Sequence, residues 1–146
     1  MTPRIIYLVK RAEIEVTSRM AKALDTFEIT PIQFSILYFI DITKGDLSSA
    51  QLSRRFSMTP QSMNELVQIL ERKKLVKKNV DRQHRRILRI SLTARGTQLL
   101  TKCNAELDLL EEALLIELSV NEIGLLRDLL GKILHHAREA VDIAKS

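Results

Sequence analysis

The sequence predicts a mainly α-helical protein with a small β-hairpin wing: a winged helix-turn-helix with N- and C-terminal dimerisation helices. Three observations favour this fold class. Apolar residues recur with a helical period over most of the chain, and only four Gly and three Pro interrupt it. Two capped helices separated by a tight turn are predicted between Ser48 and Arg72. Two short alternating segments then flank an arginine-rich turn, which is typical of a hairpin.

The first two predicted helices precede this region. Arg4 to Leu24 carries apolar residues at a period of about 3.6, which indicates a long amphipathic helix. Thr30 is expected to cap a second helix, Pro31 to Asp41, with Pro31 at its favoured first position. This helix is apolar on most sides and should be buried. Lys44-Gly45-Asp46 predicts a turn after it.

The helix-turn-helix is predicted from its caps. Ser48 and Gln51 have the spacing of a capping box, and the short helix that they start is expected to bury Ala50, Leu52 and Phe56. Thr59 and Pro60 open the next helix. One stripe of that helix is apolar, and the opposite stripe is polar: Gln61, Asn64, Glu65, Gln68 and Arg72. Such amides can bond bidentately to adenine and Glu can accept from cytosine, although the same residues are ordinary on a solvated helix.

The hairpin is predicted to form a charged wing. Its strands are expected over Leu75 to Val80 and Ile87 to Leu92, where Ile90 and Leu92 alternate with Arg89 and Ser91. The turn between them holds Arg82, Arg85 and Arg86. Arginines beside a recognition helix can reach phosphates or the narrow minor groove.

The C-terminal third is predicted to be two long helices. From Thr93 onward an apolar ladder is expected on one helix: Leu99, Leu100, Cys103, Leu107, Leu110, Leu114 and Leu118. Ser119 and Glu122 form a second capping box, which opens the last helix. These helices carry more apolar surface than a small lobe can cover. Burial against a second copy would gain roughly 1.5–3 kcal/mol for each fully buried Leu.

The basic charge is concentrated in the middle of the chain. Residues 53–95 hold twelve basic and three acidic residues, a net charge of +9, whereas residues 1–52 are neutral and residues 96–146 carry −4. This segregation is expected of a protein that binds a polyanion, although a solvated basic surface is the plain alternative.

Several classes of function are disfavoured. No apolar run is long enough to span a bilayer and no signal-peptide pattern is present, so an intracellular, cytoplasmic protein without a membrane partner is expected. Cys103 lies in the leucine ladder and is interpreted as a buried packing residue rather than a redox sensor. His135 and His136 diverge around a helix, so no metal site is predicted. No catalytic motif or cofactor loop is seen, and neither catalysis nor a cofactor is expected.

Three segments give the chain a family resemblance. They are ITPIQFSIL (29–37), SMTPQSMNELVQILERKKLV (57–76) and DRQHRRILRISLTARG (81–96). Together they resemble the MarR family of bacterial transcription regulators over nearly the whole chain, and the third segment is the most distinctive. The resemblance implies an obligate homodimer on a palindromic operator, usually a repressor. In many such regulators a small, often aromatic or anionic, effector enters a cleft between the dimer helices and the DNA-binding lobe and releases the DNA.

The sequence departs from this family at three positions. His84 stands where the wing commonly has a second Asp, so a salt bridge to Arg86 is not expected. Glu65 stands where an Arg is frequent, so the base preference of the family is not carried over to this chain. Lys74 stands where Gly usually closes the recognition helix, which predicts a strained or differently capped helix end.

The predicted site residues fall into two sets. Those predicted to contact DNA are Arg54, Arg55, Thr59, Gln61, Ser62, Asn64, Glu65, Gln68, Lys73, Arg82, Gln83, Arg85 and Arg86. Those suggested for the effector, from the family layout alone, are Tyr7, Arg11, Arg19, Phe34 and Tyr38.

The predicted organisation is an N-terminal dimerisation helix (1–29), a DNA-binding lobe (30–96) and C-terminal dimerisation helices (97–146). The leading hypothesis is a dimeric, sequence-specific DNA-binding repressor released by a small molecule. Two alternatives stay open: a winged-helix module that binds proteins, and a DNA-binding activator or architectural protein without an effector.

Overall fold

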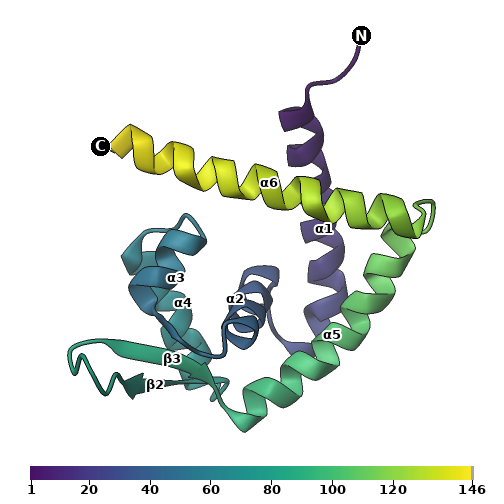
Figure 1. Ribbon diagram of the computed structural model, residues 1–146. Helices are drawn as coiled ribbons and strands as arrows, with labels where there is room; N and C mark the ends of the chain where they lie inside the picture. The colour runs from purple at the N-terminus through teal and green to yellow at the C-terminus, as the bar shows by residue number, and fades with distance from the viewer. Residues whose placement is uncertain (146) are drawn as a thin grey trace. The chain divides into compact units, whose positions relative to one another are not determined.

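A computed structural model describes residues 1–145, which form seven helices and a three-stranded sheet (Figure 1). The elements are α1 (Ile5–Leu24), the short 3₁₀ helix η1 (Asp25–Phe27), α2 (Pro31–Ile42), β1 (Leu47–Ser48), α3 (Ser49–Arg55), α4 (Pro60–Arg72), β2 (Val76–Val80), β3 (Leu88–Leu92), α5 (Ala94–Leu114) and α6 (Val120–Lys145). The mainly helical fold with a hairpin wing is therefore confirmed.

The chain divides into two compact units, residues 1–108 and 109–146, with the boundary inside α5. The first unit contains the hydrophobic core. Most of its fully buried side chains come from α2, α3, α4 and β3, including Ile36, Leu37, Leu52, Met63 and Ile90, and Leu24 of α1 and Cys103 of α5 are also fully buried. The second unit consists of the end of α5 and of α6, and none of its described side chains is buried.

The predicted caps are confirmed by their hydrogen bonds. Thr30 and Ser48 each accept from the backbone of the third residue of their helix, at 3.3 Å, and Gln33 and Gln51 bond back to the caps. Ser119 and Glu122 form the same reciprocal pair at the start of α6. Each box satisfies amide groups that a helix leaves without partners at its first turn.

The sheet contains a strand that was not predicted. β1 is only two residues long and pairs antiparallel with β3, Leu47 opposite Ile90, so the strand order is β1-β3-β2. β3 thus lies between the wing strand β2 and the segment that enters α3. Ile90 is 1% exposed and anchors β3 to the core.

Two expectations about packing are wrong. Ala50 is exposed on α3, and Ser53 takes the buried position while donating its hydroxyl hydrogen to the carbonyl of Ala50 at 2.7 Å. Leu118 does not extend the ladder of α5, because the helix ends at Leu114 and a turn follows.

The end of α4 bears out the expectation about Lys74. Its φ of 61° is left-handed, a conformation that favours glycine. Lys74 N donates to Glu71 O at 2.9 Å and Leu75 N to Leu70 O at 3.0 Å, which closes the helix as a glycine would. The helix is therefore capped normally, but by a residue for which this conformation is strained.

α5 starts against this helix end. The Thr93 hydroxyl donates to Lys74 O at 2.6 Å and accepts from Gly96 N at 3.0 Å. A Cβ on Gly96 would overlap the carbonyl of Leu75, so only glycine allows this close approach.

Candidate nucleic-acid interface

Helix α4 presents a polar face opposite its buried one. Thr59 accepts from Ser62 N at 3.1 Å and Pro60 occupies the first turn, so the start of the helix is fixed. Met63, Val67 and Leu70 are completely buried. The predicted readout residues Gln61, Asn64, Glu65 and Gln68 all lie outside the core on the remaining surface.

The turn between α3 and α4 holds the two helices in one arrangement. Ser57 has a left-handed φ of 52°, and Met58 N donates to Ser53 O at 2.9 Å. Ser49 on α3 lies 2.5 Å from the side-chain carbonyl oxygen of Asn64 on α4, to which its hydroxyl can donate. The Asn64 carbonyl is therefore engaged within the lobe, whereas its amide group makes no hydrogen bond in the described chain and can donate outward.

The wing tip is a tight turn organised by Asp81. One oxygen of its carboxylate accepts from Gln83 N at 2.8 Å and from His84 N at 3.4 Å. Asp81 N donates to Ile87 O at 2.9 Å and closes the loop. The three tip arginines are exposed and form no hydrogen bond or ion pair within residues 1–145: Arg82, Arg85 and Arg86.

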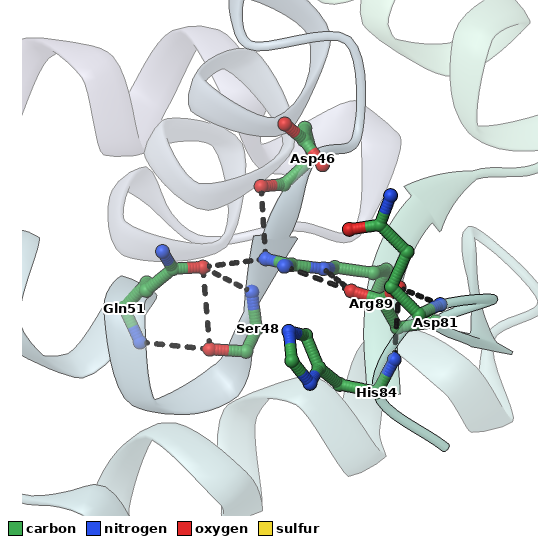
Figure 2. Close-up of polar contacts among 7 residues, drawn as sticks. Asp46, Ser48, Gln51, Asp81, His84 and Arg89 are labelled. Carbon is green, nitrogen blue, oxygen red and sulfur yellow. Dashed lines mark hydrogen bonds and ion pairs between the residues drawn. The ribbon is translucent and has the colours of Figure 1, made fainter. Parts of the chain in front are cut away.

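Arg89 connects this tip to the helix-turn-helix, as Figure 2 shows. Its Nε and Nη2 atoms lie 3.0 and 2.9 Å from the second carboxylate oxygen of Asp81. Its Nη1 donates to Gln51 Oε1 at 3.0 Å and to Asp46 O at 3.3 Å. Gln51 is the residue that completes the cap of α3, so a single guanidinium group spans the wing turn, the approach to α3 and the α3 cap.

The same contacts lower the pKa of the Asp81 carboxyl group below its ordinary value. The amide of Gln83 contributes most, and the guanidinium of Arg89 follows. Both favour the charged carboxylate. The contacts therefore stabilise the charged carboxylate of Asp81 in the folded wing.

The role of Arg89 was not predicted from the sequence, in which it is only a polar residue alternating along a strand. Asp81 could in principle pair with any of four nearby arginines. The register Asn79 opposite Arg89 brings this arginine to Asp81, and only a correctly paired hairpin reveals it. As expected from His84, Arg86 has no ion pair in the part of the chain that the structure describes.

Three more basic residues that were predicted to contact DNA lie in different surroundings: Arg54, Arg55 and Lys73. Arg54 is exposed in the last turn of α3. The guanidinium of Arg55 lies 4.8 Å from the centre of the Phe39 ring, in a cation–π contact. Lys73 Nζ donates to Glu28 O at 2.6 Å, which ties the end of α4 to the loop after η1.

The residues suggested for an effector form two separate groups. Arg11 donates to the Tyr7 hydroxyl at 3.4 Å and lies 3.8 Å from Glu15, while Arg19 is exposed further along α1. Phe34 and Tyr38 stack on α2 with ring centres 5.8 Å apart. No hydrogen bond or ring contact joins the two groups in residues 1–145.

The other side chains weighed for redox or metal chemistry are one cysteine and two neighbouring histidines of α6. Cys103 is completely buried, and burial raises the pKa of its thiol. His135 and His136 are exposed and lie 3.0 and 3.9 Å from Glu139. Across the described residues, no three His, Cys, Asp or Glu side chains are placed to hold a metal ion. Nor does any helix there combine the length and hydropathy that crossing a bilayer requires.

A capped helix pair followed by a hairpin, with a third short strand leading into the pair, defines a winged helix-turn-helix. The MarR family model matches residues 27–87. The HTH-type transcriptional repressor Rv2887 of Mycobacterium tuberculosis is 33% identical over 99 residues, which cover 68% of this chain and 70% of that protein. The chain therefore belongs to the MarR family.

Other similarities agree with this assignment. YhbI of Bacillus subtilis, an uncharacterized HTH-type transcriptional regulator, is 25% identical over 90% of this chain and 81% of its own length. The S. aureus MepR–DNA complex superposes with a TM-score of 0.78 at 26% identity, covering 92% of this chain and 96% of MepR. Apo MarR from E. coli gives 0.78 at 20% identity over 92% and 99%, which supports the fold alone. The names of the relatives describe transcription regulators rather than enzymes.

Proposed function

We propose that this protein is a sequence-specific DNA-binding transcription regulator that acts as a homodimer, with α4 in the major groove and the wing tip against the adjacent backbone or minor groove. The observation that carries this proposal is the set of three tip arginines without partners, beside a helix with an exposed face of short polar side chains. Cationic groups that the fold leaves unpaired are available to phosphates.

Family membership supports DNA as the partner. MepR has been solved with DNA, and a MarR mutant with operator DNA. The basic middle of the chain, +9 over residues 53–95, complements the negative charge of a duplex.

The exposed apolar residues of α1 and α6 support a dimer. On α6, Leu126, Leu130 and Ile133 recur at helical spacing and are 36–44% exposed. A two-fold pair would present two α4 helices to major grooves about 34–36 Å apart and would read an inverted repeat.

We infer in addition that the protein represses transcription and is released by a small molecule. Rv2887 carries the name of a repressor, which supports the first part. A titration of phenolic and carboxylic acids against the DNA complex tests the second part, and no release by any of them would favour a regulator without an effector.

The main test replaces Arg82 and Arg86 by Ala and measures binding to the promoter fragment of the protein's own gene by fluorescence anisotropy. Removing two cationic groups that touch DNA should weaken binding by about 10- to 100-fold. The slope of log affinity against log salt should also shrink by about 1 for each phosphate that is no longer neutralised. The matched control is Lys22→Ala combined with Lys44→Ala, which removes two exposed cations outside the predicted DNA-binding set and should bind like the parent.

Helix content and dimer mass should be unchanged in the Arg82→Ala/Arg86→Ala variant. If its affinity equals that of the parent, the wing has no part in DNA binding. If the parent protein binds no promoter fragment at any salt concentration, a protein-binding module becomes the better account.

A further inference from the structure

Glu65 lies on the exposed polar face of α4 and has no partner among the residues that the structure describes. The basic middle of the chain holds three acidic side chains: Glu65, Glu71 and Asp81. The Glu71 carboxylate lies 3.9 Å from the ammonium group of Lys78. The Asp81 carboxylate lies 2.9 Å from the guanidinium group of Arg89. Two of the three carboxylates therefore have a structural role, and Glu65 does not.

The surroundings of Glu65 on the helix offer it no such role. It lies in the second turn of α4, beyond the first turn in which the helix dipole favours negative charge. No basic residue stands three or four positions away, the separations that a helical side chain can reach: those positions hold Gln61, Ser62, Gln68 and Ile69. Gln61 and Gln68 are exposed, one turn to either side of Glu65. A carboxylate thus occupies the centre of the polar stripe.

The chemistry of a carboxylate decides which base it can face. An ionised carboxylate only accepts hydrogen bonds, and the phosphates repel it, so it is favourable against DNA only where a base edge offers a donor. In the major groove guanine presents two acceptors, and thymine presents an acceptor and a methyl group. Adenine presents its amino group beside the N7 acceptor, which repels the second carboxylate oxygen. Cytosine presents its amino group alone. A carboxylate therefore favours cytosine over adenine and rejects guanine and thymine.

We propose that Glu65 selects a cytosine in each half of the operator, by accepting a hydrogen bond from the 4-amino group of that base in the major groove. This inference rests on the proposed function, because it assigns a role to one residue of the DNA-reading helix. The cytosine donor offsets the repulsion between Glu65 and the phosphates, whereas guanine and thymine leave that repulsion without compensation. Glu65 therefore contributes more to the rejection of wrong sequences than to affinity for the right one.

The first experiment selects the duplexes that the full-length protein binds, from a pool with a randomised central segment, and sequences the bound fraction. The parent should enrich an inverted repeat with a strongly preferred cytosine in each half. Glu65→Gln should keep the repeat and change that position to adenine, because a carboxamide both donates and accepts and can bond adenine bidentately. The matched control is Glu71→Gln, the same change at an ion-paired side chain of the same helix, which should enrich the sequence of the parent.

The second experiment removes the amino group of the base instead of the carboxylate. In the enriched duplex, 2-pyrimidinone, which lacks the 4-amino group, replaces the cytosine whose preference depends on Glu65. The parent should bind this duplex at least about 5-fold more weakly, whereas Glu65→Ala should bind the two duplexes with similar affinity. Because each protein is compared on both duplexes, any general effect of the altered base pair cancels. Fluorescence anisotropy measures the four affinities, and circular dichroism checks the helix content of Glu65→Ala.

Three results would overturn the proposal: an enriched sequence that Glu65→Gln leaves unchanged at every position, a Glu65-dependent position occupied by a base other than cytosine, or an equal loss on the modified duplex in the parent and in Glu65→Ala. Each of them leaves the proposed regulator intact, since the parent would still have selected a sequence. A parent that enriches no sequence would contradict the proposed function, and the role of Glu65 with it.

Discussion

Helices α4 and α6 are both amphipathic, but their apolar faces differ in burial within one chain. On α4, Met63, Val67 and Leu70 are fully buried. On α6, Leu125, Leu129 and Leu134 are 58%, 46% and 62% exposed, and no described side chain of that helix is buried. Similar sequence patterns therefore lead to a completed core in one place and an uncovered surface in the other.

The difference shows which apolar surfaces a single chain can bury by itself. The lobe around α4 buries its apolar side chains in its own core. None of its buried side-chain nitrogen or oxygen atoms lacks a hydrogen bond. An apolar face as long as that of α6 is costly in water, which favours its burial against another chain. The following changes test this contrast, from the largest expected effect to the smallest.

The substitution Leu130→Glu places a carboxylate on the exposed apolar face of α6. A carboxylate buried in an apolar dimer interface should raise the dimer dissociation constant by at least about 100-fold. Sedimentation velocity at several concentrations measures this. Lys132→Glu, which places the same charge on an exposed polar position of α6, is the control. A Leu130→Glu protein that remains dimeric would mean that α6 is covered by something other than a second copy.

The substitution Leu70→Ala removes most of a buried side chain from the core around α4. Its side chain is 0% exposed, and the cavity left behind should lower the free energy of unfolding by about 2–5 kcal/mol. Urea denaturation followed by circular dichroism gives the value. Leu134→Ala on α6 should cost far less within the chain. Equal losses at high protein concentration would show that both faces are equally buried in the assembly.

Arg89→Gln tests the polar connection inside the lobe. The wing should lose its fixed position relative to α3, and DNA affinity should fall by about 10-fold with the fold retained. Arg89→Lys should recover little, because the donors of a compact ammonium group lack the planar, spread arrangement with which the guanidinium group reaches Asp81, Gln51 and Asp46 together. Asp81→Asn combined with Arg89→Gln should be clearly less than additive, and simple additivity would show that the two residues act independently.

Acidification tests the same connection without mutation. The pKa of Asp81 is lowered from 3.8 in the folded protein, so its stabilising contribution is present above that value and is lost as pH falls through the folded-state pKa. The carboxyl resonance of Asp81 should therefore titrate below pH 3.8 in the parent. In Arg89→Gln its midpoint should rise only partly, because the Gln83 amide remains. An unchanged midpoint would remove Arg89 as a cause.

Local features of this fold could be predicted from the sequence, and distant ones could not. The caps at Thr30, Ser48, Thr59 and Ser119 depend on residues three apart, so their hydrogen bonds follow directly from spacing. β1 has two residues and no alternation to detect, and it pairs with a strand about forty residues later. The burial of Ala50 was predicted wrongly because the short helix α3 has too few turns to define its buried face.

The same difference between local and distant features holds for the candidate DNA interface. The exposed face of α4 and the tip arginines follow from periodicity and turn position, whereas the choice of Arg89 among the arginines near Asp81 depends on strand register. Whether the predicted DNA-binding residues touch DNA stays a prediction.

The central position of β3 limits how this wing can change in length. Adding one residue inside β3 would reverse the faces of every residue beyond it, moving Ile90 out of the core and Arg89 away from the α3 cap. Adding residues between Arg82 and Arg86 would disturb neither. We therefore expect this wing to accept a change of length at its tip, while β3 must keep its length.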